Sequence, residues 1–412
     1  MTGGPAVRRL VDWEASDLRT LAAEHGTPLY VVDLDRVAEN LDRLRAAFPD
    51  AHIHYAAKAN AGRAVLERLE REGSGVECAS AGEVVRALEA GFDGDDVLYT
   101  PVNPPARDLD TVVDRAAENP GLTVTAGARE TIDRLETRGY DGRLAIRAHP
   151  GIGAGHGESV ATGGDASFGI PAEAVPTVLE DAADRGFDVV GVHAHTGSGL
   201  SNEDRSAHRS VVEALAEVVA ETAVDLEFVD VGGGFGVPYR PEEPPLDLEP
   251  IAEATRDALA HLDVDLAIEP GRYLVADAGV LLATVNTVKP AGDAGTFAGV
   301  DAGMTTLLRP ALYDSYHHIR TLAADAADRD EATVTVVGPV CESTDVLGAD
   351  RALPEPRRGD VLAIGNAGAY GIEMSNQYTS RPRPAVVALE GGDDRVVRGR
   401  ETISDLTTKE RR

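Results

Sequence analysis

Eight short apolar runs, rich in valine, leucine and alanine, alternate with amphipathic segments through the first two thirds of the chain. The runs cover residues 52–59, 75–80, 97–101, 122–127, 144–151, 189–198, 226–234 and 266–273. The amphipathic segments cover 63–72, 81–90, 111–118, 129–138, 172–185, 202–221 and 248–261, and several end at a glycine, which commonly terminates a helix. Eight strands that alternate with helices predict a parallel (β/α)8 barrel rather than a doubly wound sheet, which usually has fewer strands.

The pattern changes after about residue 285. Apolar runs at 297–300, 333–340, 360–364 and 385–389 are separated by turn-forming glycine, proline and aspartate, with few helical segments between them. This predicts a mostly antiparallel β domain over residues 286–412. The early run 27–32 precedes the first barrel strand, so we expect residues 1–35 to complete the β domain and residues 36–285 to form the barrel.

The barrel prediction can be tested on the chemistry at its strand ends, because barrel enzymes build their active sites at the carboxyl ends of the strands. Polar or glycine-rich positions follow most of the eight runs, and they are Lys58, Glu77, Ser80, Arg147, His149, His195, Ser198, Gly232–Gly236, Glu269 and Arg272. The topology alone therefore predicts that these residues converge on one site.

Lysine is nearly absent from the chain, with Lys58, Lys289 and Lys409 against 36 arginines. Lys58 lies in the apolar segment Tyr55-Ala-Ala-Lys58-Ala-Asn60. An arginine could replace it as a charge but not as a nucleophilic amine, because the guanidinium does not lose its proton. We interpret Lys58 as an amine that forms a Schiff base with a carbonyl, most simply that of pyridoxal phosphate (PLP). The alternative is a lysine at a strand end whose ammonium group reaches solvent.

The glycine loop Val229-Asp-Val-Gly-Gly-Gly-Phe-Gly236 follows the seventh strand, where barrels commonly bind phosphate through backbone N–H groups. Ser198 and Arg272 would add a hydroxyl and a cation to the same phosphate. Glu269, in Glu269-Pro-Gly271-Arg272, could keep a pyridine nitrogen protonated and so favour decarboxylation. The alternatives are an ordinary tight turn and a structural ion pair between Glu269 and an arginine.

Other candidate residues have more than one interpretation. His195 could stack on a cofactor ring; zinc binding by His193 and His195 is the competing interpretation, but no third ligand has suitable spacing, so we expect no metal. Cys78 is interpreted as a small core residue. Segments 338–345, 366–371 and 308–313 of the β domain carry a thiol beside carboxylates, a tyrosine in a glycine-rich turn, and an arginine paired with a tyrosine that could bind a carboxylate.

Composition excludes several other classes of protein. The chain carries 43% hydrophobic residues, enough for real cores, and a net charge of -31 spread along its length. Dispersed acid without lysine is typical of proteins from salt-accumulating halophiles, and it argues against nucleic-acid binding. No apolar stretch is long enough to span a membrane and no signal peptide is visible, so we expect a cytoplasmic protein with free thiols at Cys78 and Cys341.

These residues together resemble the diaminopimelate decarboxylases, PLP enzymes with an alanine-racemase-type barrel, from Thr27-Pro-Leu-Tyr30 to Arg381-Pro-Arg-Pro384. The resemblance implies that Lys58 forms the Schiff base, that His195 stacks on the ring and that Glu269 faces the pyridine nitrogen. It implies further cofactor contacts from Glu77, Ser198, Gly233, Gly234, Gly271, Arg272 and Tyr370.

The resemblance also implies a homodimer in which Cys341 and Glu342 are supplied across the interface. Cys341 would take part in protonating the carbanion, and Glu342 would contact the distal ammonium of the substrate. The distal carboxylate would be bound by Arg272, Arg309 and Tyr313, with Tyr370 also at the substrate. Ornithine and lysine lack a distal carboxylate, so this set favours meso-2,6-diaminopimelate, which would yield L-lysine and CO₂.

The sequence departs from the family pattern at four places. Glu77 stands where the family usually has aspartate, and His149 where it usually has asparagine. The element Ser-Lys-Phe-Gly reads Ala166-Ser-Phe-Gly169, and Gln377-Tyr378 alters the segment before Arg381.

Four alternatives share parts of this pattern, and one of them, a short PLP-carrier protein, would lack the β domain altogether. A racemase would want an arginine rather than Glu269 at the pyridine nitrogen. A decarboxylase of ornithine, arginine or carboxynorspermidine would keep Glu269 without needing Arg309 and Tyr313. A catalytically silent PLP-binding regulator would usually lack Lys58 or Cys341.

Overall fold

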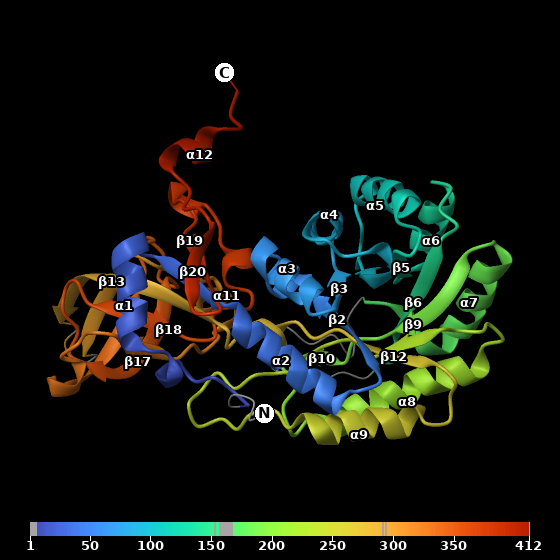
Figure 1. Cartoon of the computed structure of the whole chain (residues 1–412), viewed down its shortest axis with the longest axis horizontal. Coiled ribbons are helices and arrows are strands. Elements are labelled where there is room, and N and C mark those ends of the chain that lie inside the picture. The colour runs from blue at the N-terminus through green and yellow to red at the C-terminus, as the bar shows by residue number, and fades with distance from the viewer. Residues whose placement is uncertain (1–5, 152–153, 156–167, 291, 293–294, 412) are drawn as a thin grey trace. The chain divides into compact units, whose positions relative to one another are not determined.

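Two compact units make up the protein, whose computed structural model describes residues 6–151, 154–155, 168–290, 292 and 295–411 (Figure 1). The barrel unit consists of Asn40–Val237 and Leu246–Leu274, and the sheet unit of Met1–Glu39, Pro238–Pro245 and Val275–Arg412. The expected boundary at 285/286 therefore lies too late in the chain. The reason is that β13 (Gly279–Pro290) pairs with strands of the sheet unit.

The barrel unit contains the predicted closed ring of eight parallel strands. They are β2 (Ala51–Ala56), β3 (Gly75–Cys78), β4 (Val97–Tyr99), β5 (Thr123–Ala126), β6 (Arg143–His149), β9 (Asp188–His193), β11 (Phe228–Asp230) and β12 (Asp265–Ile268). Each pairs in parallel with the next, and β12 returns to pair with β2. Strand β4 and residues 189–192 of β9 are buried, which explains their continuous apolar sequences.

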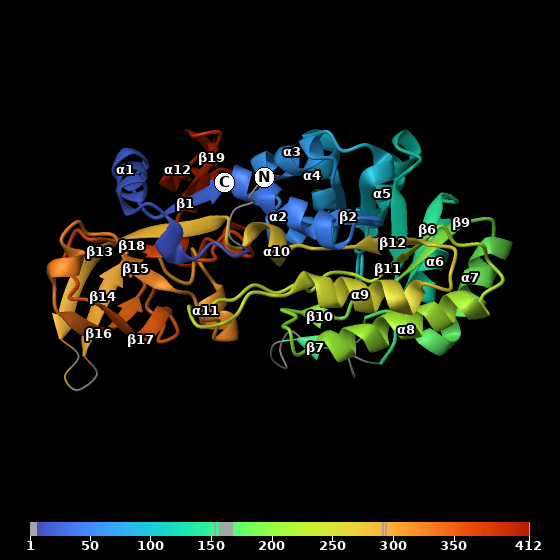
Figure 2. The same cartoon turned by 60° about the horizontal axis from the view of Figure 1, so that its bottom comes forward.

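Helices alternate with these strands as predicted. They are α3 (Arg63–Arg71), α4 (Ala81–Ala90), α5 (Ala106–Glu118), α6 (Arg129–Glu136), α7 (Val175–Asp184), α8 (Arg205–Glu221) and α9 (Leu248–Leu259). Local signals set their ends: α4 begins where the Ser80 hydroxyl accepts a hydrogen bond from the Glu83 N–H and ends at Gly91, whose φ is 107°. The long helices α8 and α9 lie side by side (Figure 2).

Shorter elements accompany the barrel. The strands β7 (Ala154–Gly155) and β10 (Gly197–Ser198) form a parallel pair, and β8 (Ile170–Pro171) pairs with β6. The helices α2 (Leu34–Ala47) and α10 (Arg272–Val275) contain boundaries between the two units.

The sheet unit is built on a mostly antiparallel sheet, as expected. Its strands are β1 (Leu29–Asp33), β13, β14 (Thr296–Val300), β15 (Ile319–Thr321), β16 (Glu331–Val337), β17 (Val346–Pro354), β18 (Val361–Ile364), β19 (Ala385–Glu390) and β20 (Asp393–Arg398). Only the β1–β19 and β14–β16 pairings are parallel among those assigned. The N-terminal strand β1 lies between β13 and β19, so the early run belongs to this sheet as predicted. The helices α1 (Ala15–His25), α11 (Arg309–Tyr313) and α12 (Ile403–Thr407) also belong to this unit.

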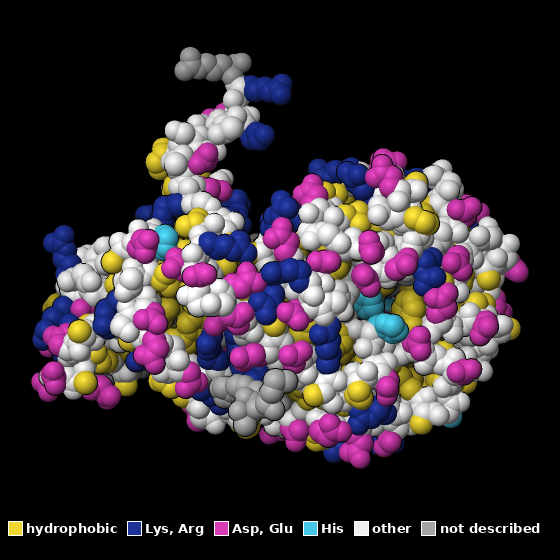
Figure 3. Space-filling model, in the orientation of Figure 1, with side chains coloured by type: hydrophobic (Ala, Val, Ile, Leu, Met, Phe, Trp, Pro, Cys, Tyr) yellow, Lys and Arg dark blue, Asp and Glu magenta, His cyan; other side chains and the backbone are white. Residues whose placement is uncertain are grey.

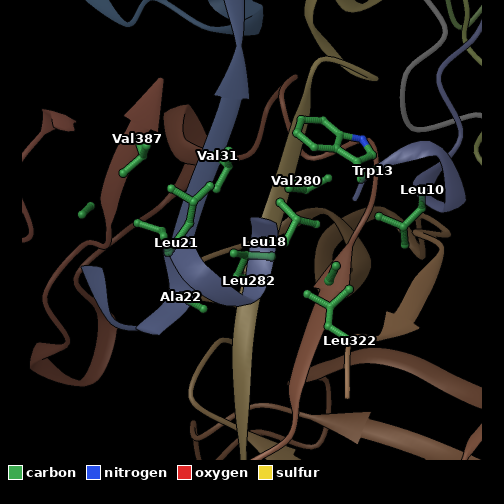
Figure 4. Close-up of a cluster of buried hydrophobic side chains, with 13 residues drawn as sticks. Leu10, Trp13, Leu18, Leu21, Ala22, Val31, Val280, Leu282, Leu322 and Val387 are labelled. Carbon is green, nitrogen blue, oxygen red and sulfur yellow. The ribbon is translucent and has the colours of Figure 1, made fainter. Parts of the chain in front are cut away.

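A cluster of buried hydrophobic side chains holds α1 against this sheet (Figure 4). Leu18 and Leu21 of α1 pack with Val31 of β1 and with Val280 and Leu282 of β13. Removing such side chains from water is the main stabilising contribution to a core of this kind, at about 25 cal/mol per Å² of apolar surface. The helix α1 and the strand β1 near the N-terminus therefore form part of the hydrophobic core of the sheet unit.

Acidic side chains are spread over the face of the protein seen in Figure 3, with arginines interspersed among them. They are not gathered into one patch on that face. Among the described residues, none of the helices combines the length and apolar character needed to cross a membrane.

Candidate active site

Lys58 lies in a short 3-10 turn (Ala57–Ala59) directly after β2, at the carboxyl end of that strand. Its Nζ donates a hydrogen bond to Glu77 Oε2 at 2.9 Å. The Lys58 side chain is 40% exposed, whereas that of Glu77, on β3, is only 1% exposed. Burial raises the pKa of Glu77 to about 7, against the opposing effect of Lys58. The amine is thus reachable and held by a carboxyl group whose charge changes near neutral pH.

Glu269 follows β12 and is almost fully buried. Its Oε2 lies 3.2 Å from His193 Nε2, while Oε1 has no hydrogen-bond partner in the described part of the chain. Burial disfavours ionisation, but the hydrogen bond from His193 and the positive charge of Lys58 hold the pKa of Glu269 below its ordinary value. A buried carboxylate with one vacant oxygen is suited to receive a hydrogen bond from a ligand.

His195 follows β9, two residues after His193. Its Nδ1 accepts a hydrogen bond from the Gly233 N–H at 3.2 Å. Burial, together with the charges of Lys58 and Arg147, lowers the pKa of His195 to about 3. The ring is therefore a neutral imidazole, as stacking on an aromatic cofactor requires.

The glycine loop after β11 approaches other backbone segments closely. A Cβ on Gly233 would lie 2.1 Å from the carbonyl oxygen of Glu269, and one on Gly234 would lie 2.4 Å from that of Gly197. Gly234 also has a φ of 96°, which other residues rarely adopt. Side chains are excluded here for steric reasons, which leaves a bare backbone that a phosphate can approach.

Arg272 and Ser198, both predicted to contact the cofactor phosphate, lie together, with Arg272 Nη2 donating to Ser198 Oγ at 3.3 Å. Gly271 permits close packing against the Lys58 turn, because a Cβ there would lie 3.1 Å from that of Ala56 and 3.2 Å from that of Ala59. The barrel unit thus combines an amine, a buried carboxylate, a neutral imidazole, a glycine loop and a cation with a hydroxyl.

Arg309, the first residue of α11, belongs to the sheet unit and is 7% exposed. Its guanidinium donates hydrogen bonds to Tyr239 Oη at 2.7 Å and Ser315 Oγ at 3.2 Å. No carboxylate within the described ranges forms an ion pair with it. Tyr313, at the other end of α11, is exposed. A nearly buried cation without an anionic partner is available to a ligand carboxylate.

Cys341 and Glu342 are exposed on the sheet unit, and Glu342 Oε1 accepts a hydrogen bond from Tyr378 Oη at 2.5 Å. The sequence analysis identified Tyr378 only as a departure from the family pattern and did not predict this contact. Tyr370 has a φ of 54°, a strained value for a non-glycine residue and one often found at functional sites. Cys78 is buried, and burial raises its thiol pKa well above the ordinary range, consistent with a core residue.

The structure brings together the barrel candidates Lys58 with Glu77, Ser198 with Arg272, and His195 with the glycine loop. Ser80 instead caps α4. No third potential metal ligand near His193 was evident from the sequence. The structure places potential ligand atoms of His193, Asp230 and Glu269 within 4.8 Å of one another. The departure at 166–169 lies partly outside the described residues.

PLP fits the barrel residues on chemical grounds. Lys58 offers the amine for its aldehyde, and Glu269 Oε1 is vacant for the pyridine nitrogen. The glycine loop, with Ser198 and Arg272, offers backbone and side-chain groups for the phosphate.

Comparison with known proteins gives the same class. Residues 34–276 match the family model described as "Pyridoxal-dependent decarboxylase, pyridoxal binding domain". The protein is therefore a PLP-dependent decarboxylase with a barrel and a mostly antiparallel sheet.

Within that class, the chain belongs to the diaminopimelate decarboxylase family. It is 45% identical over 406 residues to diaminopimelate decarboxylase of Methanothermobacter thermautotrophicus, covering 95% of this chain and 93% of that relative. It is 36% identical over 420 residues to the Escherichia coli K12 protein of that name, covering 97% of each. The crystal structure of a Helicobacter pylori diaminopimelate decarboxylase variant complexed with L-lysine has a TM-score of 0.88 at 34% identity, covering 95% of this chain and 98% of that one.

Proposed function

We propose that the protein removes CO₂ from the D-configured end of meso-2,6-diaminopimelate and releases L-lysine, the last step of lysine biosynthesis. The relatives named above carry this activity in their names. The observation that supports the substrate for this chain is Arg309, a nearly buried guanidinium with no carboxylate partner within the described ranges. Substrates without a distal carboxylate would leave that charge uncompensated.

The barrel residues have distinct roles in this proposal. When bound, PLP supplies the electron-poor ring that takes up the electron pair left by the departing carboxylate. Lys58 holds PLP through Nζ, and Glu77 keeps that amine in place. Glu269 keeps a proton on the pyridine nitrogen, and His195 stacks on the ring as a neutral imidazole. Phosphate contacts come from Ser198, Gly233, Gly234, Gly271 and Arg272, and Tyr370 completes the cofactor site.

The sheet-unit residues bind the substrate's far end and return a proton. Arg309, Tyr313 and Arg272 bind the distal carboxylate, with Tyr370 beside it. Glu342 accepts hydrogen bonds from the distal ammonium, and Cys341 delivers a proton from Sγ to the carbon that lost CO₂. Their union with the barrel residues in one site is part of the proposal.

The proposal includes a homodimer, with Cys341 and Glu342 contributed to the site of the partner subunit. Both residues are exposed in the single chain, although their assigned chemistry requires a substrate contact. The net charge of -31 supports a setting at high salt, in the cytoplasm of a cell that accumulates salt.

Borohydride reduction of the PLP-loaded enzyme, followed by peptide mapping, tests the cofactor assignment. The three lysines make the readout unambiguous, and we expect the label on Lys58 alone. Lys58→Arg, which keeps the charge beside Glu77, should abolish labelling and turnover, whereas the matched controls Lys289→Arg and Lys409→Arg should retain both. A label elsewhere, or turnover by Lys58→Arg, contradicts the assignment.

A further inference from the structure

His193 and Glu269 form a contact that is closed off from solvent. His193 is the last residue of β9 and is 2% exposed; Glu269 is 3% exposed. The 3.2 Å contact joins His193 Nε2 to Glu269 Oε2 and leaves Oε1 as the carboxylate oxygen without a described partner. The histidine therefore determines which oxygen of Glu269 is available.

The direction of this hydrogen bond follows from the surroundings of the ring. His193 Nδ1 has no hydrogen-bond partner among the described residues, and burial lowers the pKa of His193. The ring is thus neutral and carries one proton. An ionised carboxylate can only accept, so the proton lies on Nε2 and is donated to Glu269 Oε2.

Asp230 is a second buried carboxyl group next to this pair. It ends β11, which pairs with both β9 and β12, and Asp230 lies in register with His193. It is 1% exposed, and its Oδ1 accepts a hydrogen bond from the Gly232 N–H at 2.8 Å. Its Oδ2 has no N–H or hydroxyl donor within the described ranges, and when protonated the carboxyl group can donate a hydrogen bond to the neighbouring Glu269.

Two carboxyl groups this close in a buried site do not both ionise. Burial, followed by the charge of Glu269, raises the pKa of Asp230 well above its ordinary value, while the pKa of Glu269 is held low. The proton shared by the two acids therefore lies on Asp230, and the single negative charge lies on Glu269.

We propose that His193 and Asp230 are positioning residues for Glu269, His193 by occupying Oε2 and Asp230 by lying beside the pair, in register with His193 on the neighbouring strand. Together they present Oε1 as a charged acceptor to the pyridine nitrogen of PLP. This inference rests on the proposed role of Glu269. It assigns a purpose to His193 that the zinc interpretation of the sequence did not consider.

The test compares His193→Leu with His193→Gln, whose amide can still donate to Glu269. We expect Leu to weaken PLP binding to the apoprotein about 10-fold, the loss of one hydrogen bond to a charged group, and to shift the pH titration of the bound cofactor's absorbance. His193→Gln should retain most of the wild-type affinity for PLP and most of the wild-type pH titration. Circular dichroism and thermal unfolding report whether each variant is folded.

Two further variants separate positioning from a general structural role. Asp230→Asn imitates a protonated acid and should bind PLP within about 3-fold of wild type, whereas Asp230→Ala should not. In a Glu269→Gln background, His193→Leu should have no further effect on PLP binding or on the titration. An undiminished effect there, or loss of PLP binding by Asp230→Asn, overturns the proposal.

The remaining outcomes are also decisive. If Glu269→Gln alone leaves PLP binding and its titration unchanged, the proposed role of Glu269 fails and the inference falls with it. If Glu269→Gln has a large effect but folded His193→Leu has none, only the inference fails. Stoichiometric zinc in the purified apoprotein that is lost in His193→Leu would show a metal site and overturn the positioning role.

Discussion

Arg309 and Glu269 each carry a charge at a position where burial makes an unmatched charge costly. Such groups persist where a ligand supplies the missing partner, which is why buried, incompletely paired side chains indicate binding sites. For Arg309 the described hydrogen-bond partners are the hydroxyl groups of Tyr239 and Ser315 and, at 3.4 Å, Nε2 of His317, and none of them carries a negative charge that would neutralise the guanidinium.

Arg309→Ala should raise KM for diaminopimelate by about 30- to 150-fold, the range expected when a charge-assisted contact worth about 2–3 kcal/mol is lost. The KM of Arg309→Lys should lie between those of the wild type and Arg309→Ala, because lysine keeps the positive charge but cannot bind a carboxylate through two parallel hydrogen bonds. Steady-state kinetics with Arg107→Ala as control, whose side chain is 90% exposed, makes the comparison. A KM unchanged in Arg309→Ala removes this residue from the substrate site.

At the scale of elements, the barrel strands could be predicted because burial on both faces gives several of them, such as β4 and β9, short apolar sequences that alternate with helical segments. The edge strands β17 and β20 were not predicted. The sequence of β20 is largely polar and exposed, and Asp350 and Arg351 interrupt the apolar residues of β17, so pairing with β16 and β19 makes them strands. The helix α1 was also missed, since alternation with barrel strands says nothing of segments before the first one.

The site shows the same division. Lys58 and Glu269 follow barrel strands, so topology alone placed them. The contacts of Tyr378 with Glu342 and of Asp230 with Gly232 depend on loop geometry that no periodicity encodes. The available signal for His193 was its position two residues before His195, a spacing that would place both on one face of a strand, although β9 ends at His193.

The helix pair α8 and α9 is joined by a buried histidine. His208 Nε2 lies 2.8 Å from Thr255 Oγ1, and its Nδ1 lies 3.3 Å from Thr196 Oγ1, next to His195. Thr255 Oγ1 donates to the Ile251 carbonyl, so it accepts from His208 Nε2–H, and Nδ1 accepts from Thr196.

Burial lowers the pKa of His208 to about 4, so below its unfolded value near 6.5 the unfolded chain binds more protons. The stability that this neutral histidine provides is present above about pH 6.5 and is lost as pH falls toward 4. We therefore expect His208→Gln to cost about 2 kcal/mol less at pH 4.5 than at pH 7.5, measured by urea unfolding in KCl. The exposed His261→Gln is the control, and an equal cost for His208→Gln at both pH values contradicts this account.

Across the whole molecule, the net charge of -31 is the main source of electrostatic repulsion within the folded protein. The Debye length falls from about 30 Å at 0.01 M to about 3 Å at 1 M salt, so repulsion between dispersed carboxylates is long-ranged only at low salt. Local ion pairs such as Arg143 with Glu227 relieve a part of it.

Dilution from molar KCl should therefore dissociate or unfold the protein. Thermal unfolding and sedimentation across a KCl series measure both, and sucrose at matched osmolarity controls for effects other than charge screening. Full structure and an unchanged assembly at low salt would refute a salt requirement.

The most direct test of the account is CO₂ release in high KCl with added PLP, offering meso-diaminopimelate, ornithine, arginine and carboxynorspermidine in parallel. We predict turnover of diaminopimelate alone, with L-lysine as the product. Turnover of a substrate without the distal carboxylate would contradict the role of Arg309, and no turnover of any of the four would contradict the proposed activity itself.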